Sequence, residues 1–184
     1  MIKLFYPLGT AFRCLQGIIS EKEGVRVRGK EYKSVIRSEG CGDAMGRSLN
    51  ALDLGQTAVM TRKFTMEDVR RCMDLTGDDN QMYWDETFAQ KTRYKRTIVQ
   101  GLLTEGLVTA LINSRIPGPG ALLLNKELVF PNPVFVGESI TAQIEVVDIN
   151  LERRWVTEKV ICTKEDGNEV IRGQIVLFVE NVSG

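Results

Sequence analysis

Histidine is missing altogether from this chain of 184 residues. Its absence excludes a Ser-His-Asp triad, a Cys-His dyad and any zinc site that uses histidine within the chain, because each of them needs an imidazole. Cysteine is scarce, with four residues and no Cys-x-x-Cys pair, which argues against a cysteine zinc site. Four scattered cysteines indicate reduced thiols in a cytoplasmic protein rather than a disulfide framework.

An excess of charge of either sign is also missing, since 24 basic residues balance 24 acidic ones. The balance argues against a strongly basic nucleic-acid binder and against an acidic disordered chain. No apolar run approaches the ~20 residues of a membrane-spanning helix. We therefore expect a globular protein that binds neither nucleic acid nor a membrane.

The first fifty residues differ from the rest, because they hold 9 of the basic and only 5 of the acidic side chains. The run EGCGDAMG at 39–46 has a Gly-x-Gly spacing, but the preceding KEYKSVIRS is too charged for the buried strand of a dinucleotide fold. We predict an N-terminal extension over 1–50, poorly ordered or loosely docked, and a single domain over 51–184.

Two helices of different character are predicted in that domain. Residues 56–64 alternate as a strand, and Thr65 then resembles an N-cap with Asp68 three residues on, which predicts a helix that Gly77 ends. A short helical turn is expected within 84–94. Residues 98–115 are apolar around nearly the whole circumference, which predicts a buried helix.

Four strand-like runs follow, over 121–130, 139–150, 155–164 and 170–180. Asp166-Gly167-Asn168 between the last two is a hairpin signal. Strands joined by short turns pair antiparallel, and the helix over 98–115 is the candidate to cover one face of the sheet. The fold class is therefore α+β, an antiparallel sheet wrapped around one long buried helix.

The stretch from Phe64 to Leu103 resembles the MaoC-like dehydratases, the (R)-specific enoyl-CoA hydratases of the hot-dog fold. GDDNQMYWD at 77–85 stands where that family has G-D-x-N-P-x-H-x-D, and IVQGL at 98–102 stands where it has I-x-H-G-M. FPNPVFVGESITAQIEV at 130–146 resembles the family's P-V-x-x-G-D turn and the strand after it. The resemblance covers about residues 51–180 and implies a hot-dog domain.

The resemblance also implies a reaction. In the family, a loop Asp and a His five positions later activate a water that adds to C3 of a trans-2-enoyl thioester, while a proton goes to C2. A backbone N–H at the helix start holds the thioester oxygen. By resemblance the catalytic pair is Asp78 and Tyr83, with Tyr83 at the position of the His, and Gly101 provides the N–H.

Two further residues are implied to bind substrate, Asn80 beside the catalytic Asp and Thr109 about eight residues into the helix. Gln81 and Gln100 stand where the family has Pro and a second His. No cofactor is implied, and we interpret the acidic residues around Asp78 as a solvated loop in preference to a magnesium site. The basic residues at 93–96 are either solvated surface or contacts to the phosphates of coenzyme A.

Three functions stay open, because Tyr83, with an ordinary pKa of about 10, cannot replace His as a base near neutral pH. The first is an enoyl-thioester hydratase with an altered acid–base pair. The second is a non-catalytic subunit of a hot-dog heterodimer that binds acyl thioesters, and the third is a thioesterase. Each implies a CoA or acyl-carrier-protein thioester as ligand and a homodimer or heterodimer formed through sheet edges.

Overall fold

The computed structural model of the chain describes residues 49–180. Its strands are β1 (Thr57–Lys63), β2 (Ala121–Val129), β3 (Ser139–Asn150), β4 (Trp155–Lys164) and β5 (Glu169–Val179). Its helices are η1 (Leu49–Ala51), α2 (Met66–Thr76), α3 (Gln81–Trp84), α4 (Glu86–Lys91) and α5 (Gly101–Ser114). The expectations for residues 1–48 lie outside the described residues.

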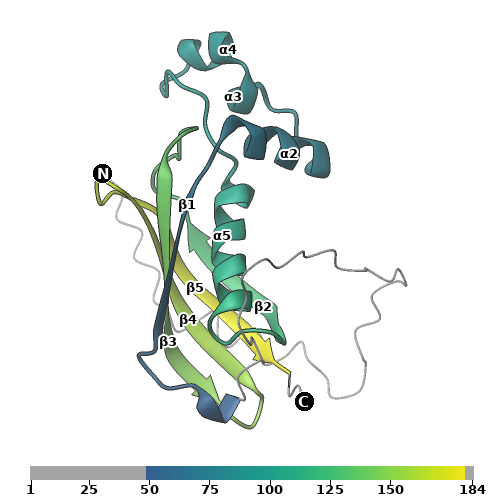
Figure 1. Cartoon of the computed structure of the whole chain (residues 1–184), viewed down its shortest axis with the longest axis vertical. Helices are drawn as coiled ribbons and strands as arrows, with labels where there is room; N and C mark the ends of the chain where they lie inside the picture. Colours follow the sequence, from purple (N-terminus) through teal and green to yellow (C-terminus); the bar gives the residue numbers. More distant parts are fainter. Residues whose placement is uncertain (1–48, 181–184) are drawn as a thin grey trace, which may run out of the picture. The chain divides into compact units, whose positions relative to one another are not determined.

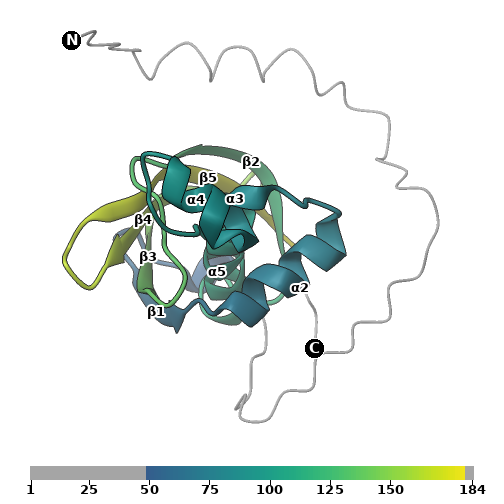
Figure 2. The same ribbon diagram turned by 90° about the horizontal axis from the view of Figure 1, so that it is seen from above.

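One antiparallel sheet and one long helix dominate the fold. The strand order is β1-β3-β4-β5-β2, and α5 lies along one face of the sheet (Figure 1). Seen from above, the strands curve around α5, while α2, α3 and α4 lie over its N-terminal end (Figure 2). We call residues 66–91, which contain these three helices, the helical cap. The predicted α+β sheet wrapped around a helix is confirmed.

The core lies between the inner face of the sheet and one side of α5. Inward positions alternate along β3 and β4, as expected for strands with one face covered. The buried apolar residues of this layer include Ile140, Ile144, Val146, Val156, Val160, Leu111 and Ile112. None of the helices between residues 49 and 180 is long and apolar enough to cross a membrane.

The prediction that the strand-like runs after the helix pair antiparallel with one another through short turns is only partly right. β3, β4 and β5 follow one another through turns, but β2 lies at the far edge beside β5. The reason is that residues 130–138, which join β2 to β3, do not form a tight turn between neighbouring strands. There the N–H of Val99 donates to the carbonyl of Val134 at 2.8 Å and Ile98 forms a β-bridge with Phe135, so the segment pairs with the residues just before α5.

The prediction that the helix is buried all round is wrong. α5 begins at Gly101 rather than at 98, and its side chains face two environments. Leu107 and Leu111 are buried against the sheet, whereas Leu102 is 57% exposed and Thr109 and Ala110 are also exposed. A single layer of sheet covers one side of a helix, so an apolar composition on the other side leaves an apolar surface.

Candidate functional site

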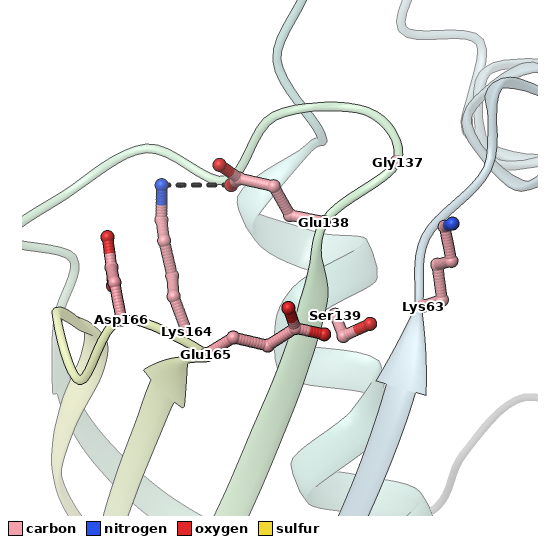
Figure 3. Close-up of a pocket in the computed structure, with 7 residues that line it drawn as sticks. All are labelled: Lys63, Gly137, Glu138, Ser139, Lys164, Glu165 and Asp166. Carbon is pink, nitrogen blue, oxygen red and sulfur yellow. Dashed lines mark ion pairs between the residues drawn. The ribbon is translucent and has the colours of Figure 1, made fainter.

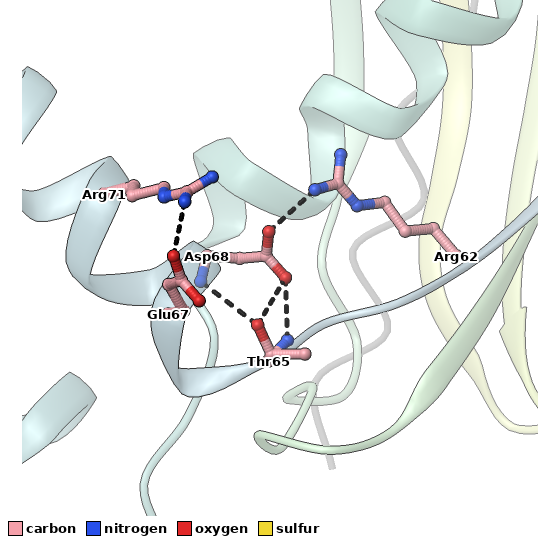
Figure 4. Close-up of polar contacts among 5 residues, drawn as sticks. All are labelled: Arg62, Thr65, Glu67, Asp68 and Arg71. Atoms are coloured by element: carbon pink, nitrogen blue, oxygen red, sulfur yellow. Dashed lines mark hydrogen bonds and ion pairs between the residues drawn. The ribbon is translucent and has the colours of Figure 1, made fainter.

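The helical cap starts at a capping box, which Figure 4 shows. The N–H of Asp68 donates to Thr65 Oγ1 at 3.2 Å, and the N–H of Thr65 donates to Asp68 Oδ2 at 2.9 Å. Arg62 adds an ion pair to Asp68 at 2.8 Å. The Thr65 hydrogen bonds, followed by the Arg62 charge, hold the pKa of Asp68 below its usual range. The predicted N-cap is confirmed, and it fixes where α2 begins.

α2 ends as predicted, at Gly77 in the left-handed conformation with φ of 72°. The loop that follows is held by its own polar groups. Asp78 Oδ1 accepts from the N–H of Asn80 at 3.3 Å, and Asn80 Oδ1 accepts from the N–H of Met82 at 3.0 Å, which caps α3. Asp78 is exposed, so its carboxylate is reachable by water. The side-chain oxygen of Asn80 is used as a cap, and its predicted role in substrate binding stays a prediction.

Tyr83 on α3 lies beside Asp78. Burial raises the pKa of the half-buried Tyr83 phenol, and the charge of Asp78 and a side-chain hydrogen bond to it raise that pKa further. The thiol of Cys72 on α2 is a third group in this cluster, since burial and the charge of Asp78 raise its pKa too. The structure therefore brings Asp78 and Tyr83 together and adds a thiol that sequence reasoning did not place at the site. A phenol with a raised pKa stays protonated near neutral pH and can donate a hydrogen bond.

The N-terminus of α5 lies beneath the cap (Figure 2). Gln100 is its N-cap residue, yet the side chain of Gln100 makes no capping bond within the described part of the chain. The first-turn N–H of Gly101 therefore lies at the positive end of a 14-residue helix, where an oxyanion is favoured. A Cβ added to Gly101 would meet the Phe130 ring at 3.4 Å, so a larger residue here would crowd the end of β2.

The carboxamide of Gln100 was not anticipated from the sequence as a functional group. Gln100 is only 3% exposed. Its side-chain Nε2 donates to the backbone carbonyl of Val69 on α2 at 3.1 Å. The backbone carbonyl of Gln100 accepts from the Thr104 hydroxyl at 3.3 Å. Its Oε1 is buried and has no hydrogen-bond partner among residues 49–180. Its position in the family-like I-V-Q-G-L run was the one sequence signal that could have drawn attention to it.

Other residues singled out from the sequence have local partners. Arg93 donates to the Tyr94 hydroxyl at 2.6 Å, Lys95 donates to the carbonyl of Gln90 at 2.9 Å, and the Arg96 guanidinium lies 4.6 Å from the centre of the Phe135 ring. Thr109 lies exposed about 12 Å along α5 from Gly101, as the helical rise of 1.5 Å per residue requires, and its role stays a prediction. Within residues 49–180 no three metal-ligating side chains gather to hold an ion.

A separate hollow of about 330 Å³ lies where β1 ends and β3 begins (Figure 3). Lys63 and Lys164 line it together with Glu138, Glu165 and Asp166. Lys164 is paired with Glu138 at 2.9 Å. The hollow mixes both signs of charge and includes none of the residues predicted for the site, so the cluster of Asp78, Tyr83 and the start of α5 is the better candidate.

Comparisons with known proteins agree on one family. The family model described as MaoC like domain matches residues 49–168. An (R)-specific enoyl-CoA hydratase of Rhodospirillum rubrum is 34% identical over 125 residues, which are 68% of this chain and 86% of that protein. A 3-hydroxybutyryl-CoA dehydratase of Methylorubrum extorquens is 34% identical over 120 residues, 65% of this chain and 75% of that protein. The solved structure of an (R)-hydratase from A. caviae involved in PHA biosynthesis matches with a TM-score of 0.68 and 30% identity, over 71% of this chain and 98% of that one.

Proposed function

This chain belongs to the MaoC-like domain family, and on that premise we propose that it is an acyl-thioester hydratase or dehydratase. The reaction adds water across the double bond of a trans-2-enoyl thioester, or removes it in reverse. The names of the two relatives support this reaction class. The observation that carries the proposal is the exposed carboxylate of Asp78 beside the half-buried phenol of Tyr83 on the cap.

Asp78 is the general base. Its carboxylate takes a proton from water as the water oxygen bonds to C3, and the C2=C3 electron pair moves toward the thioester carbonyl. The resulting enolate oxygen is held by the N–H of Gly101 at the positive end of α5. The proton on Asp78 then goes to C2, which restores the carbonyl and the carboxylate. Every proton and electron pair is accounted for without a metal or cofactor.

Tyr83 orients the base rather than acting as one. Its phenol stays protonated because burial and the Asp78 charge raise its pKa, so it donates to a carboxylate or to the attacking water. The hydroxyl of Thr109 and the amide of Asn80 are proposed substrate contacts. A site with one base and a phenolic donor is expected to be slower than one with a carboxylate and an imidazole, since an acid–base group contributes about 10²–10⁴ in rate.

The protonated phenol also favours a second candidate function. A chain that keeps the N–H at the start of α5 but lacks the imidazole can bind an acyl thioester without turning it over. Such a chain would act as the binding subunit of a heterodimer. The exposed apolar residues at one sheet edge support association in either case: Leu122, Leu123, Leu124, Val129 and Phe130 on or next to β2. We therefore propose a dimer through the β2 edge, with a CoA or acyl-carrier-protein thioester as ligand.

The loss of enoyl-thioester absorbance tests the two functions. Purified chain is mixed with crotonyl-CoA, beside the variants Tyr83→Phe and Tyr83→His. Turnover in the parent that falls in Tyr83→Phe supports the hydratase with a phenolic donor. No turnover in the parent, with turnover gained in Tyr83→His, supports the binding subunit. No turnover in any of them, at protein concentrations that saturate the ligand, rejects the hydratase for this substrate.

A further inference from the structure

The carboxamide of Gln100 is held at one end only. Nε2 donates to the Val69 carbonyl at 3.1 Å, and this bond identifies which end of the amide is the NH₂ group, because a carbonyl oxygen can only accept. The other end, Oε1, is buried without a partner among the described residues. Buried acceptors in folded proteins are nearly always paired with protein or with water, so an unpaired one calls for an explanation.

This unpaired oxygen belongs to the N-cap residue of α5 and lies where that residue contacts α2. Gln100 directly precedes Gly101, whose N–H is proposed to hold the thioester oxygen. Val69, which anchors the amide, lies one helical turn before Cys72 on α2. Cys72 in turn is close enough to Asp78 for the carboxylate to raise the thiol pKa. The amide oxygen is therefore buried at the junction of α2 with the first turn of α5.

The junction offers a donor and an acceptor to a ligand. The N–H of Gly101 can only donate, and Gln100 Oε1 can only accept. A saturated or unsaturated acyl thioester can accept from the Gly101 N–H through its carbonyl oxygen, but it has no O–H group that could donate to Gln100 Oε1. A 3-hydroxyacyl thioester fills both, since its carbonyl accepts and its 3-hydroxyl donates. In the hydration direction the same hydroxyl oxygen enters as water.

We propose that Gln100 Oε1 accepts a hydrogen bond from the 3-hydroxyl group of a 3-hydroxyacyl thioester and from the water that becomes it. The inference rests on the proposed function and assigns the site a preference for hydroxylated over saturated acyl groups. Gln100 thereby becomes a specificity-determining residue, because its acceptor is left unpaired by any ligand that lacks the hydroxyl.

The test compares affinities and does not depend on turnover. The full chain carrying Asp78→Asn, which prevents conversion during the titration, is titrated calorimetrically with (R)-3-hydroxybutyryl-CoA and with butyryl-CoA. We expect the hydroxylated ligand to bind roughly ten- to a hundredfold more tightly, the range set by leaving a buried acceptor unpaired. Methionine is similar in length to glutamine but has no acceptor. Adding Gln100→Met is therefore expected to lower the affinity for the hydroxylated ligand alone, so that the two ligands bind about equally well.

A matched control separates recognition from general damage. Thr104→Val removes the other buried polar side chain of this helix start, whose hydroxyl donates to the Gln100 carbonyl, and it leaves Oε1 in place. It should keep the preference. Gln100→Leu also lacks an acceptor and should also lose the preference, so it replaces Gln100→Met in the test if that variant does not fold.

The outcomes are distinguishable. Equal affinity of the Asp78→Asn chain for the two ligands, or a preference unchanged in Gln100→Met, overturns the role of Gln100 while acyl-thioester binding stands. Failure to bind either ligand overturns the proposed function itself, and the inference with it.

Discussion

The helical cap and the interior of the sheet each hold a carboxyl group and a thiol, but they differ in access to water. Asp78 in the cap is exposed, and Cys72 beside it is half-buried. Glu158 and Cys162 both point inward from β4 and are fully buried. The side chain of Glu158 has no hydrogen-bond partner within the described part of the chain, and burial raises its pKa to about 8. Burial likewise raises the pKa of Cys162 to about 12.

The difference shows that a strongly shifted pKa does not by itself mark the chemical site. Glu158 is flanked across the sheet by Val146 on β3 and Ile175 on β5, which offer no hydrogen bond. At neutral pH its carboxyl group is mostly protonated, and its side chain lies in the sheet interior, away from the cap. Asp78 is exposed, as the proposed general base has to be. We therefore propose that the chemistry takes place at the cap, and that the buried carboxyl group of Glu158 affects stability instead.

The largest expected effect separates the two carboxyl groups by activity. Asp78→Asn should lower kcat/KM for crotonyl-CoA hydration by about 10²–10⁴, the usual contribution of an acid–base group. Glu158→Gln, the matched change in the sheet, should leave it near the parent value. Steady-state rates of both variants, with circular dichroism to verify folding, provide the measurement. Equal losses in the two variants would contradict the assignment of the chemistry to the cap.

The next effect concerns Glu158 and the dependence of the free energy of unfolding on pH. Glu158 has a folded pKa of about 8 and an ordinary value of 4.5, so the folded state holds the extra proton between these values. Its contribution to stability is fully present below pH 4.5 and is lost as pH rises towards 8, at up to about 1.4 kcal/mol per pH unit. Urea unfolding at several pH values should show this slope in the parent and a flatter profile in Glu158→Gln. The same slope in both proteins would contradict the claim that burial without a partner raises the pKa of Glu158.

A smaller effect compares the start of the cap with the exposed part of the sheet through two threonines. Thr65→Ala removes the N-cap of α2 and should cost about 1 kcal/mol. Thr61→Ala removes a hydroxyl pair with Thr141 across two strands, 2.9 Å apart and exposed, and should cost only a few tenths of a kcal/mol. Hydrogen exchange should report faster opening of α2 in Thr65→Ala alone. Equal opening of α2 in both variants would show that the capping box does not hold the cap.

Local signals in the sequence predicted much of the fold. The N-cap at Thr65, the terminating Gly77 and the hairpin at 166–168 all follow from residues adjacent in the chain. The bounds of β3 and β4 also match, because one covered face imposes strict alternation. The place of β2 at the far edge could not be predicted in this way, since it depends on the path of the segment between β2 and β3 past the start of α5.

The candidate site was predictable only in part. The family-like run placed Asp78 and Tyr83 close in sequence, and the structure brings their side chains together. The buried oxygen of Gln100 depends on the packing of α5 against α2, and the isolation of Glu158 depends on neighbouring strands. A Glu at an inward position of a strand pattern carries no local signal of whether a partner will face it.

The most direct test of the central claim is the identity of the product formed from crotonyl-CoA in water labelled with heavy oxygen. We expect 3-hydroxybutyryl-CoA with the label at C3 and the thioester intact, and no such product from Asp78→Asn. Free coenzyme A together with label in the carboxylate of crotonate would contradict the proposed hydration, because water would then have attacked the carbonyl and the chain would be a thioesterase.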